Sequence, residues 1–457
     1  MVMQQKMGGW GMGFEWYETT LGEICKFTAG SAFKPEHQGG KAGQYPFIKV
    51  SDMNLSGNEI FIRHAQNFVS ADLKDEMNAK EHRAGATVFA KIGVALQSNR
   101  RRLLVRPTII DNNMMSATPK AGKISSRFLY FLLSTLDFNT ISAGSALPYL
   151  NVSDLQKMNV TIPRDGETQH DIENVLGALD DRITLLRETN ATLEAIAQAL
   201  FKSWFVDFDP VRAKMEGRAP EGMDEATAAL FPDSFEESEL GLVPRGWKTA
   251  RVADIAEVVK GKSYSSKNLV ESHHTALVTL KSFERGGGFR MDGFKPYSGA
   301  YKPAQIVMAG DLILAYTDVT QAAELIGKPA IVVGVDEFQT LVASLDVGII
   351  RPNEVVCGKQ FLYGLFRTDA FQAHTLAHTS GTTVLHLAKD GVGSYVFPLP
   401  NVQLVHSFEE IASAIGERKQ TNSDAIRTLT TLRDTLLPRL ISGTLRLPEA
   451  HAELEAV

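Results

Sequence analysis

The stretch from Gln169 to Phe205 reads QHDIENVLGALDDRITLLRETNATLEAIAQALFKSWF. Apolar residues recur in it at alternating intervals of four and three, and only Asn190 interrupts this heptad pattern. The positions concerned are Ile172, Leu176, Leu179, Ile183, Leu186, Asn190, Leu193, Ala197 and Leu200. Such a seam predicts a helix that packs along another helix over its whole length. At 1.5 Å per residue, roughly 35 residues would form a rod about 50 Å long.

A second heptad pattern near the C-terminus offers a partner for this helix. Its positions are Phe408, Ile411, Ile415, Arg418, Asn422, Ala425, Leu429, Leu432 and Leu436. Pro438 should kink or end the second helix, with Leu437, Leu440 and Ile441 packing as a terminal plug. Two helices that are joined through a globular lobe can run antiparallel. Asn190 and Asn422 would either set the register of the seam or face water at a helix end.

The chain contains an internal repeat. Trp16–Phe33 (WYETTLGEICKFTAGSAF) aligns with Trp247–Tyr264 (WKTARVADIAEVVKGKSY), and FLYFLL at 128–133 aligns with FLYGLF at 361–366. Further matches pair Gly85 with Gly310, Gly144 with Gly381, and Pro163 with Pro400. Because the matches keep their order while the offset drifts only slightly, they indicate a tandem duplication of about 230 residues.

Each copy is expected to fold as an α+β lobe of roughly 150 residues. The expected strands are 24–27, 47–50 and 159–162 in the first copy, and 255–259, 311–315 and 394–399 in the second; helices are expected at 126–136 and 359–367. The predicted organisation is a disordered lead-in at 1–15, a lobe at 16–165, a helix at 166–206, an acidic linker at 207–243, a lobe at 244–402, a helix at 403–445 and a tail at 446–457.

Composition and charge limit the possible classes of protein. The chain is 44% hydrophobic and 22% charged, which is ordinary for a soluble globular protein, and no apolar run approaches the length of a membrane span. Its two cysteines, Cys25 and Cys357, form no disulfide framework and fit a reducing cytoplasm. The net charge of −6 hides a contrast: residues 207–240 hold ten acidic against three basic residues, whereas residues 80–111 hold seven basic against two acidic. DNA therefore remains a possible partner.

The sequence lacks several common catalytic patterns. There is no GxxxxGK[ST] phosphate loop and no GxSxG nucleophile turn. His374 and His378 are four apart but lack the glutamate of HExxH, and the carboxylates at 233, 236 and 237 lack the nearby lysine of a nuclease cluster. A large duplicated protein without such a constellation is more typical of a reader or a scaffold than of an enzyme.

Several loops carry residue types that recognise DNA. Gln97–Arg102 (QSNRRR) joins amides, a hydroxyl and guanidinium groups, which suit adenine, guanine and phosphates, although the same stretch would also suit a solvated hairpin end. The comparable stretch of the second lobe, Thr317–Gln321, is polar but not basic. Ser145–Tyr149 and Ser380–His386 precede the last strand of each lobe and are either ligand-contacting loops or plain turns. The candidate DNA-binding residues are Lys91, Gln97, Ser98, Asn99, Arg100, Arg101, Arg102, Ser145, Tyr149, Lys262, Tyr264, Thr317, Thr320, Gln321, Ser380, Thr382 and His386.

Three stretches resemble one known family. LFKSWFVDFDPVRAK (200–214), FPDSFEESELGLVPRGW (231–247) and LRDTLLPRLISGTLRL (432–447) closely resemble the specificity subunit of type I restriction–modification systems. The resemblance covers the chain from about Trp16 to Leu447. One departure is that Ala86 stands where the second lobe has Asp311, after the glycine of the usual Gly-Asp turn.

The resemblance implies two target-recognition domains, each reading one half of a bipartite, asymmetric site in double-stranded DNA. It implies that the two helices form an antiparallel coiled coil that fixes the spacing of the half-sites. Two methyltransferase subunits would supply S-adenosylmethionine chemistry on adenine, and two restriction subunits would use ATP and Mg²⁺ to translocate and cleave. The chain itself would hold no cofactor or metal and catalyse nothing. The alternatives are a scaffold whose lobes bind other proteins and an undetected enzyme.

Overall fold

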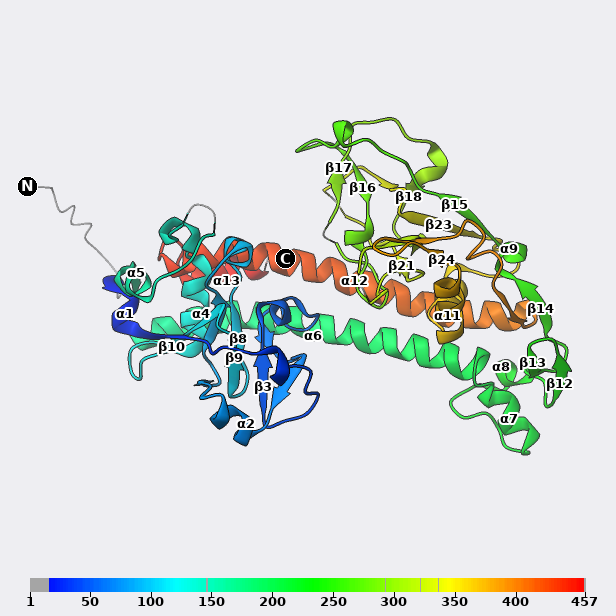
Figure 1. Ribbon diagram of the computed structural model, residues 1–457, viewed down its shortest axis with the longest axis horizontal. Helices are drawn as coiled ribbons and strands as arrows, with labels where there is room; N and C mark the ends of the chain where they lie inside the picture. Colours follow the sequence, from blue (N-terminus) through cyan, green and yellow to red (C-terminus); the bar gives the residue numbers. More distant parts are fainter. Residues whose placement is uncertain (1–15, 145–146, 292, 321, 336, 456–457) are drawn as a thin grey trace, which may run out of the picture. The chain divides into compact units, whose positions relative to one another are not determined.

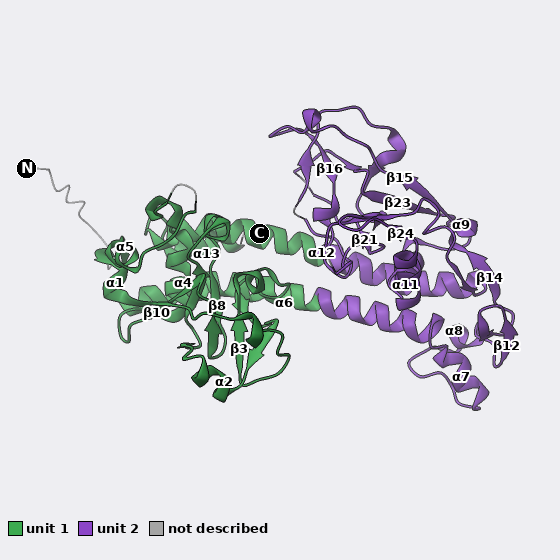
Figure 2. Cartoon of the chain, viewed as in Figure 1, with its two compact units in different colours: residues 1–189, 422–457 green, residues 190–421 purple. Residues whose placement is uncertain are grey.

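The computed structural model describes residues 16–455 except 145–146, 292, 321 and 336, so the expected lead-in at 1–15 lies outside the described residues (Figure 1). The chain forms two compact units (Figure 2). Unit 1 combines Met1–Thr189 with Asn422–Val457, and unit 2 comprises Asn190–Thr421. Unit 1 is therefore built from both ends of the chain, and unit 2 from its middle.

Unit 1 contains three sheets and a set of short helices. The first and last strands of the first repeat form a two-stranded antiparallel sheet, β1 (Trp16–Thr20) with β11 (Asn159–Pro163). A five-stranded sheet has the order β2 (Cys25–Ala29), β10 (Met114–Pro119), β7 (Thr87–Ala90), β8 (Arg102–Leu104) and β4 (Phe61–Ile62). A four-stranded sheet has the order β5 (Asn67–Val69), β3 (Tyr45–Ile48), β9 (Thr108–Ile110) and β6 (Glu81–His82). The helices are α1 (Leu21–Ile24), α2 (Ala71–Glu76), α3 (Val94–Gln97), α4 (Ser126–Thr135), α5 (Val152–Lys157) and α13 (Leu447–Glu455).

Unit 2 repeats this plan. Its two-stranded sheet pairs β14 (Lys248–Arg251) with β26 (Val396–Leu399). The larger sheets have the orders β15 (Ala256–Lys260), β23 (Val347–Pro352), β19 (Leu312–Ala315), β21 (Pro329–Ile331), and β17 (Lys295–Pro296), β16 (Thr275–Val278), β22 (Thr340–Ala343), β18 (Ile306–Val307). A parallel pair lies at the same place in both units, β3 with β9 and β16 with β22. The shared topology confirms the tandem duplication and the α+β class.

The remaining elements of unit 2 are short. Its short helices are α7 (Asp209–Met215), α8 (Glu225–Ala229), α9 (Val252–Ile255), α10 (Lys359–Phe366) and α11 (Asp369–Ala377), and its remaining strands are β12 (Phe235–Ser238), β13 (Gly241–Pro244), β20 (Thr317–Asp318), β24 (Thr379–Ser380) and β25 (Leu385–Leu387). The acidic segment 207–243 thus contains two helices and a hairpin, and the segment after 446 forms α13 with Leu447 and Ala450 buried.

The repeated helix lies at the centre of each unit. Ser125 caps α4 by accepting a hydrogen bond from the Phe128 backbone N–H at 3.0 Å, and the apolar residues that follow are almost all buried. The core of unit 1 combines this helix with Leu176 and Leu436. The core of unit 2 combines α10 with an aromatic cluster in which the Phe201 and Phe408 rings lie 5.4 Å apart. Packing against the long helices therefore holds each lobe in place.

Two long helices each contribute to both units. They are α6 (Gly166–Phe205) and α12 (Val402–Ile441). In unit 2 the Asn190 side chain donates to the Lys419 carbonyl at 3.2 Å while Phe201 packs on Phe408, so residue numbers rise along one helix as they fall along the other. This confirms the predicted antiparallel pair. The helix α12 continues through Pro438 and ends three residues later, and Leu440 and Ile441 are buried in the core of unit 1.

The heptad positions differ in burial. The buried positions are Ile172, Leu176, Leu179, Ile183, Leu186, Phe408, Asn422 and Leu436. The half-buried positions are Asn190, Leu193, Ala197, Leu200, Ile415, Ala425, Leu429 and Leu432, and Arg418 is exposed. Ile411 does not lie in the seam, because its side chain is 41% exposed. The buried face there follows Leu404, Val405, Phe408 and Ala412 instead. An α-helix has 3.6 residues per turn, so Ala412, four residues after Phe408, lies close to the same face of the helix. Ile411, three residues after Phe408, lies further from that face.

Candidate nucleic-acid interface

The candidate loops of unit 2 meet in a small three-stranded sheet. Strand β25 lies between β20 and β24, with His386 opposite both Thr317 and Ser380. The Leu387 backbone N–H donates to the Tyr316 carbonyl at 2.9 Å and extends this pairing. Two loops that are about 60 residues apart in the sequence are thereby joined beside the repeated core.

Unit 1 builds the same arrangement from shorter segments. Tyr149 forms bridges to both Ile92 and Ala143, and the Leu150 backbone N–H donates to the Lys91 carbonyl at 2.9 Å. Residues 91 and 316 are related by the same offset as the glycine turns Gly85 and Gly310, and residues 150 and 387 by the same offset as Gly144 and Gly381. We call these paired segments the small sheet of each unit. In unit 1 they are residues 91–92, 143 and 149–150, and in unit 2 they are β20, β24 and β25.

The arginine-rich stretch of unit 1 follows α3 and leads into β8, so it is not part of the small sheet. Asn99 adopts a left-handed backbone with φ of 53°, and its side chain binds the Leu136 carbonyl and the Phe138 backbone N–H at 3.0 and 3.1 Å. Asn99 is thus occupied by an internal turn. Gln97 and Ser98 are exposed beside it.

Arg101 was predicted from the sequence to contact DNA, and this prediction is wrong because its side chain is buried. Its side chain is only 4% exposed, its guanidinium lies 3.8 Å from the centre of the Phe138 ring, and it donates to the Leu136 carbonyl at 3.0 Å. Burial lowers the pKa of this guanidinium to about 9. A planar cation can be buried in this way because it stacks on an aromatic ring while its N–H groups bind carbonyl oxygens. Arg101 therefore holds the loop together, and it does not face a ligand.

The neighbouring arginines are placed differently. Arg100 is exposed and donates to the Asn54 side chain. Arg102 is half-buried in β8, and it donates to the Met53 carbonyl at 3.3 Å and the Arg101 carbonyl at 2.7 Å. Of the three arginines, only Arg100 presents its side chain at the surface.

The polar residues of unit 2 divide in the same way. Thr317 is buried and donates to Asp346 at 2.8 Å. Asp318 is buried and accepts from the backbone N–H groups of Thr320, Leu325 and Ile326. Burial would raise the pKa of Asp318, but these hydrogen bonds hold it below its usual value. The exposed candidates of this small sheet are Ser380, Thr382 and His386.

Some candidates lie elsewhere or outside the described residues. Lys262 bridges to Ser344, and Tyr264 packs edge-on against Tyr297 with ring centres 6.4 Å apart, so both lie along the sheet that contains β16 rather than in the small sheet. Ser145 and Gln321 lie outside the described residues.

Sequence reasoning missed four aliphatic residues. Val94 and Leu147 in unit 1 and Val319 and Val384 in unit 2 are exposed large hydrophobic side chains beside the small sheets. An aliphatic residue is normally assigned to the core, so composition gives no sign of its exposure. The repeat itself carried a signal, because Val94 matches Val319 and Leu147 matches Val384 at the two offsets already used.

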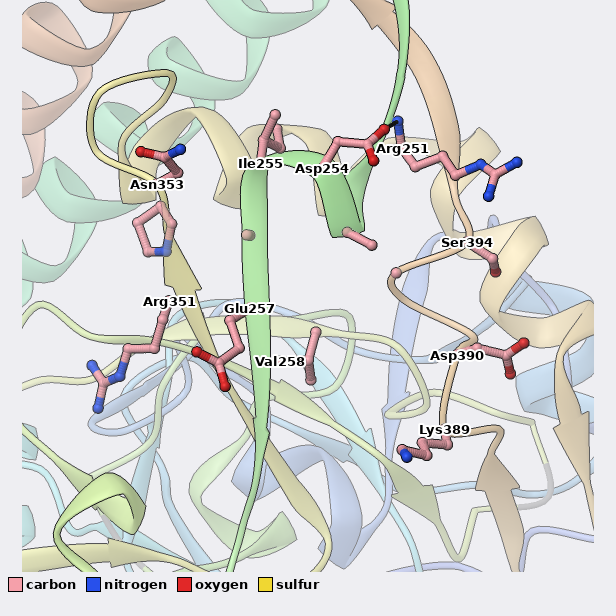
Figure 3. A pocket seen from close by; sticks show the side chains of 14 residues that line it. Arg251, Asp254, Ile255, Glu257, Val258, Arg351, Asn353, Lys389, Asp390 and Ser394 are labelled. Atoms are coloured by element: carbon pink, nitrogen blue, oxygen red, sulfur yellow. Dashed lines mark hydrogen bonds between the residues drawn. The ribbon is translucent and has the colours of Figure 1, made fainter.

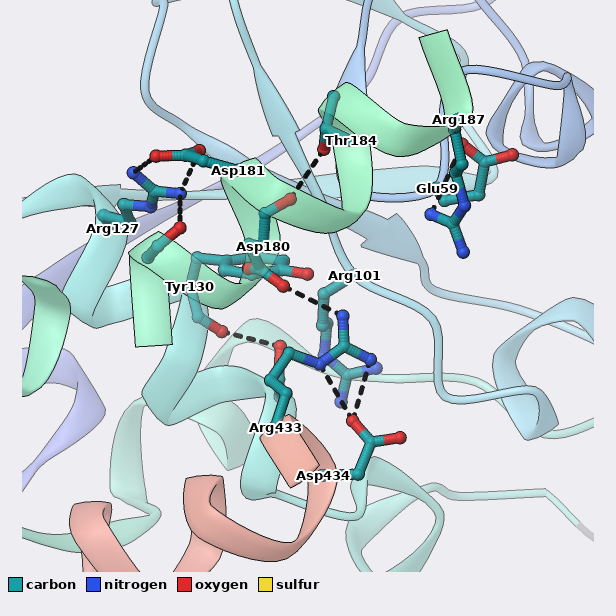
Figure 4. A network of polar contacts seen from close by, with 12 residues as sticks. Glu59, Arg101, Arg127, Tyr130, Asp180, Asp181, Thr184, Arg187, Arg433 and Asp434 are labelled. Carbon is teal, nitrogen blue, oxygen red and sulfur yellow. Dashed lines mark hydrogen bonds and ion pairs between the residues drawn. The ribbon is translucent and has the colours of Figure 1, made fainter. Parts of the chain in front are cut away.

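A polar contact fixes each repeated helix to the long helices. In unit 1, Arg433 of α12 binds Asp180 of α6 at 2.9 Å, next to Tyr130 of α4 (Figure 4). In unit 2, Glu194 of α6 accepts from the Tyr363 hydroxyl of α10 at 2.8 Å and pairs with Lys419 of α12. Tyr130 and Tyr363 are matching residues of the repeat. These contacts position the lobe that carries each small sheet.

A pocket in unit 2 is a poor candidate for a phosphate site. It lies between α9, β15 and the segment 389–394, with both charges represented in its lining (Figure 3). Three basic and three acidic residues line it: Arg251, Arg351, Lys389, Asp254, Glu257 and Asp390. The matching place in unit 1 is filled, since a Cβ on Gly22 of α1 would lie 2.9 Å from the carbonyl oxygen of Gln156 in α5. The pocket therefore reflects a local difference between the repeats.

The described residues contain neither a cluster of metal-ligating side chains nor a membrane-spanning helix. No group of three or more histidine, cysteine, aspartate or glutamate side chains there could hold a metal ion. None of the helices in that part of the chain has the length and apolar character that a membrane crossing requires.

Comparison with known proteins shows similarity to one family. Residues 14–195 match the family model described as the type I restriction modification DNA specificity domain. The chain is 26% identical to the type I restriction enzyme HindI specificity subunit of Haemophilus influenzae, over 86% of this chain and 95% of that protein. It is 23% identical to the MjaIX specificity subunit of Methanocaldococcus jannaschii, over 94% of this chain and 92% of that protein.

A solved structure is also similar. The S subunit of a type I restriction–modification system from M. genitalium has 15% sequence identity and a TM-score of 0.49, covering 94% of this chain and 97% of that chain. The family model and the full-length relatives agree with the resemblance of the three sequence stretches. Residues 14–195 thus match the DNA specificity domain of type I restriction–modification systems, and the chain as a whole is similar to type I restriction enzyme specificity subunits.

Proposed function

We propose that this chain reads a bipartite, asymmetric sequence in double-stranded DNA, one half with each unit. The observation that carries the proposal is the small sheet, which is built twice at the same place with different exposed side chains. The small sheet of unit 1 carries the exposed Tyr149 and the half-buried Lys91, whereas that of unit 2 carries the exposed Thr382 and His386. Two readers with one framework and different side chains suit a target whose halves differ.

The long helices would set the distance between the half-sites. Both α6 and α12 contain 40 residues and pass from one unit into the other. A pair of packed helices resists compression and bending better than a loop does, so its length can be converted into a number of base pairs. This supports a spacer of fixed length between the two recognised sequences.

The other subunits would supply the chemistry. We propose that two methyltransferase subunits bind the helices and lobes and methylate adenine with S-adenosylmethionine, and that two restriction subunits add ATP- and Mg²⁺-dependent translocation and cleavage. The relatives are named specificity subunits of restriction enzymes, which supports a non-catalytic role for this chain. Such a complex would act in the cytoplasm, where its DNA is.

The spacing is tested by lengthening both helices together. One heptad is inserted into α6 between Leu186 and Leu193 and a second into the facing part of α12 after Asn422, so that two turns are added without rotating the apolar face. Seven residues add about 10 Å, which corresponds to about three base pairs. Mapping methylated adenines in cells that express the complete system should show the same half-sites with a spacer longer by about three.

The control keeps the length and changes only the sequence. In the control, seven native residues next to each insertion point are replaced by the same heptad sequence, so the helices keep their native length. The spacer should then not change. Unchanged spacing in the lengthened variant, with methylation still present, would show that the helices do not set the distance.

A further inference from the structure

Four exposed aliphatic side chains mark the small sheets. In unit 1, Val94 is 81% exposed and Leu147 is 57% exposed. In unit 2, Val319 is 63% exposed and Val384 is 36% exposed. Single exposed aliphatic residues are common on protein surfaces and need no explanation. Two such residues side by side, at matching positions of both repeats, do need one.

The backbone brings the members of each pair together. In unit 1 the Gly93 backbone N–H donates to the Pro148 carbonyl at 2.8 Å, and a Cβ on Gly93 would lie 3.5 Å from the Cδ1 atom of Leu147. Val94 follows Gly93 directly. In unit 2 the equivalent residues Asp318 and Leu385 pair in adjacent strands, and Val319 and Val384 are their chain neighbours. Each pair is thus held by backbone hydrogen bonds rather than by packing of its own side chains.

The surrounding residues have diverged while the aliphatic pair is present in both repeats. Lys91 corresponds to Tyr316, Gly93 to Asp318, and Tyr149 to His386. Even the support of the loop differs, because Gly93 uses a φ of 74° where Asp318 uses three side-chain hydrogen bonds to backbone N–H groups. The small sheet therefore tolerates changes of charge, size and backbone conformation, yet each copy places two aliphatic side chains in water.

The chemistry of a DNA groove suggests what these side chains contact. The only apolar group at the edge of a base pair in the major groove is the C5-methyl group of thymine, and aliphatic side chains recognise it by contact. The domain that carries Val94 and Leu147 matches the DNA specificity domain model, and its surface includes the cations Lys91 and Arg100. Cations can contact the phosphate backbone of DNA while apolar side chains beside them contact thymine methyl groups in the major groove.

We infer that Val94 with Leu147, and Val319 with Val384, each read a thymine methyl group in one half of the target. The inference rests on the proposed function, and it adds a recognised chemical group and the residues that recognise it. It assigns discrimination between A·T and G·C pairs partly to aliphatic contact, in addition to hydrogen bonding by the polar candidates.

The test removes the methyl group from the DNA and the side chain from the protein. The full-length chain is purified together with its methyltransferase subunit, and binding to a duplex with the mapped target is measured at one fixed salt concentration. In further duplexes, each thymine of the target is replaced in turn by deoxyuridine, which lacks only the C5-methyl group. We expect one replacement in each half-site to weaken binding about fourfold, the factor for one buried methyl group.

The variants connect each methyl group to one pair of residues. Val94→Ser should weaken binding to the normal target about fourfold. Binding by this variant should no longer weaken further when deoxyuridine replaces thymine in the half-site read by unit 1, but it should still weaken when the replacement is in the other half-site. Val319→Ser should show the reverse. The matched controls are Val105→Ser in unit 1 and Val355→Ser in unit 2, at positions 45% and 77% exposed but outside the small sheets, and both should keep the full deoxyuridine response.

Two results would overturn the inference. If the wild-type complex binds its target specifically but no deoxyuridine replacement is coupled to Val94 or Val319, or if a half-site contains no A·T pair, the aliphatic contact is wrong and the proposed function stands. If the complex shows no preference for any sequence, the proposed function fails and the inference fails with it.

Discussion

The two units differ most clearly at one turn that both contain. Gly85 and Gly310 have φ values of 81° and 83°, and each precedes a buried strand of the repeated sheet. In unit 2 the next residue is Asp311, a buried carboxylate that pairs with Arg351 at 2.7 Å and Lys359 at 2.9 Å. In unit 1 the next residue is Ala86, and Thr118 and Ser126 occupy the positions that match the two cations. Both units therefore have glycine at this turn. The buried carboxylate is present only in unit 2, where both of its cationic partners are present too.

The largest expected effect comes from giving unit 1 the carboxylate alone. Ala86→Asp places a charge at a fully buried site that has neither cation, and an unpaired buried charge costs about 3–5 kcal/mol. We expect the protein to be less stable to urea by this amount. Hydrogen exchange should locate the loss in unit 1, with the amides of β7 and β10 exchanging faster than those of β19 and β23.

The missing partners provide the control. Adding Thr118→Arg and Ser126→Lys to Ala86→Asp rebuilds the set that unit 2 contains, and it should restore part of the lost stability. If Ala86→Asp alone left the exchange of unit 1 unchanged, the site would be more accessible to water than its burial indicates.

A smaller contrast separates the carboxylates on α6. Burial raises the pKa of Asp180, against the opposing attraction of Arg433. Burial also acts on Glu194, but there Lys419, Gln198 and Tyr363 together hold the pKa below its usual value. The folded protein therefore disfavours the ionised form of Asp180 and favours that of Glu194. At neutral pH, Glu194→Gln should cost about 1–3 kcal/mol. Asp180→Asn should cost less, because an amide oxygen can still accept from Arg433, which also pairs with Asp434 at 2.7 Å.

The pH dependence has opposite signs for the two residues. Because its folded pKa is lowered, the contribution of Glu194 is present above the unfolded pKa and is lost as the pH falls through the folded pKa. The difference between wild type and Glu194→Gln should therefore shrink in urea titrations below about pH 4.5. Because its folded pKa is raised, any contribution of Asp180 is present below the unfolded pKa and is lost as the pH rises. Equal losses for both variants at pH 7 would contradict this contrast.

The sequence was informative where local patterns decide the structure. The helix expected at 126–136 forms over Ser126–Thr135, because a capping serine precedes a run of buried apolar residues. The strand expected at 159–162 forms over Asn159–Pro163. The heptad count failed at Ile411, since a helix that follows its own period of 3.6 moves away from a strict period of 3.5.

Contacts between distant residues could not be predicted in this way. Arg101 is buried by Phe138 and Leu136, which lie more than 30 residues further along the chain, and no local pattern distinguishes it from the exposed Arg100. The exposure of Val94 likewise depends on Leu147 and the glycine turn beside it. Residue type therefore indicated a basic loop, but only the tertiary structure shows which side chains of the loop reach its surface.

The smallest expected effect tests this division between Arg100 and Arg101. Arg100→Ala removes one exposed cation, so it should leave the urea midpoint unchanged and weaken DNA binding by about 0.5–1 kcal/mol at moderate salt. Its plot of log affinity against log salt should be flatter by about one unit of slope, because one fewer phosphate counterion is released. Arg101→Met keeps an apolar contact with Phe138 but loses the hydrogen bonds to the Leu136 carbonyl and the Asn99 side chain, so it should lower stability by about 1–2 kcal/mol and leave the salt slope unchanged. If Arg101→Met flattened the salt slope and Arg100→Ala did not, the loop would have to open on DNA and expose the buried guanidinium.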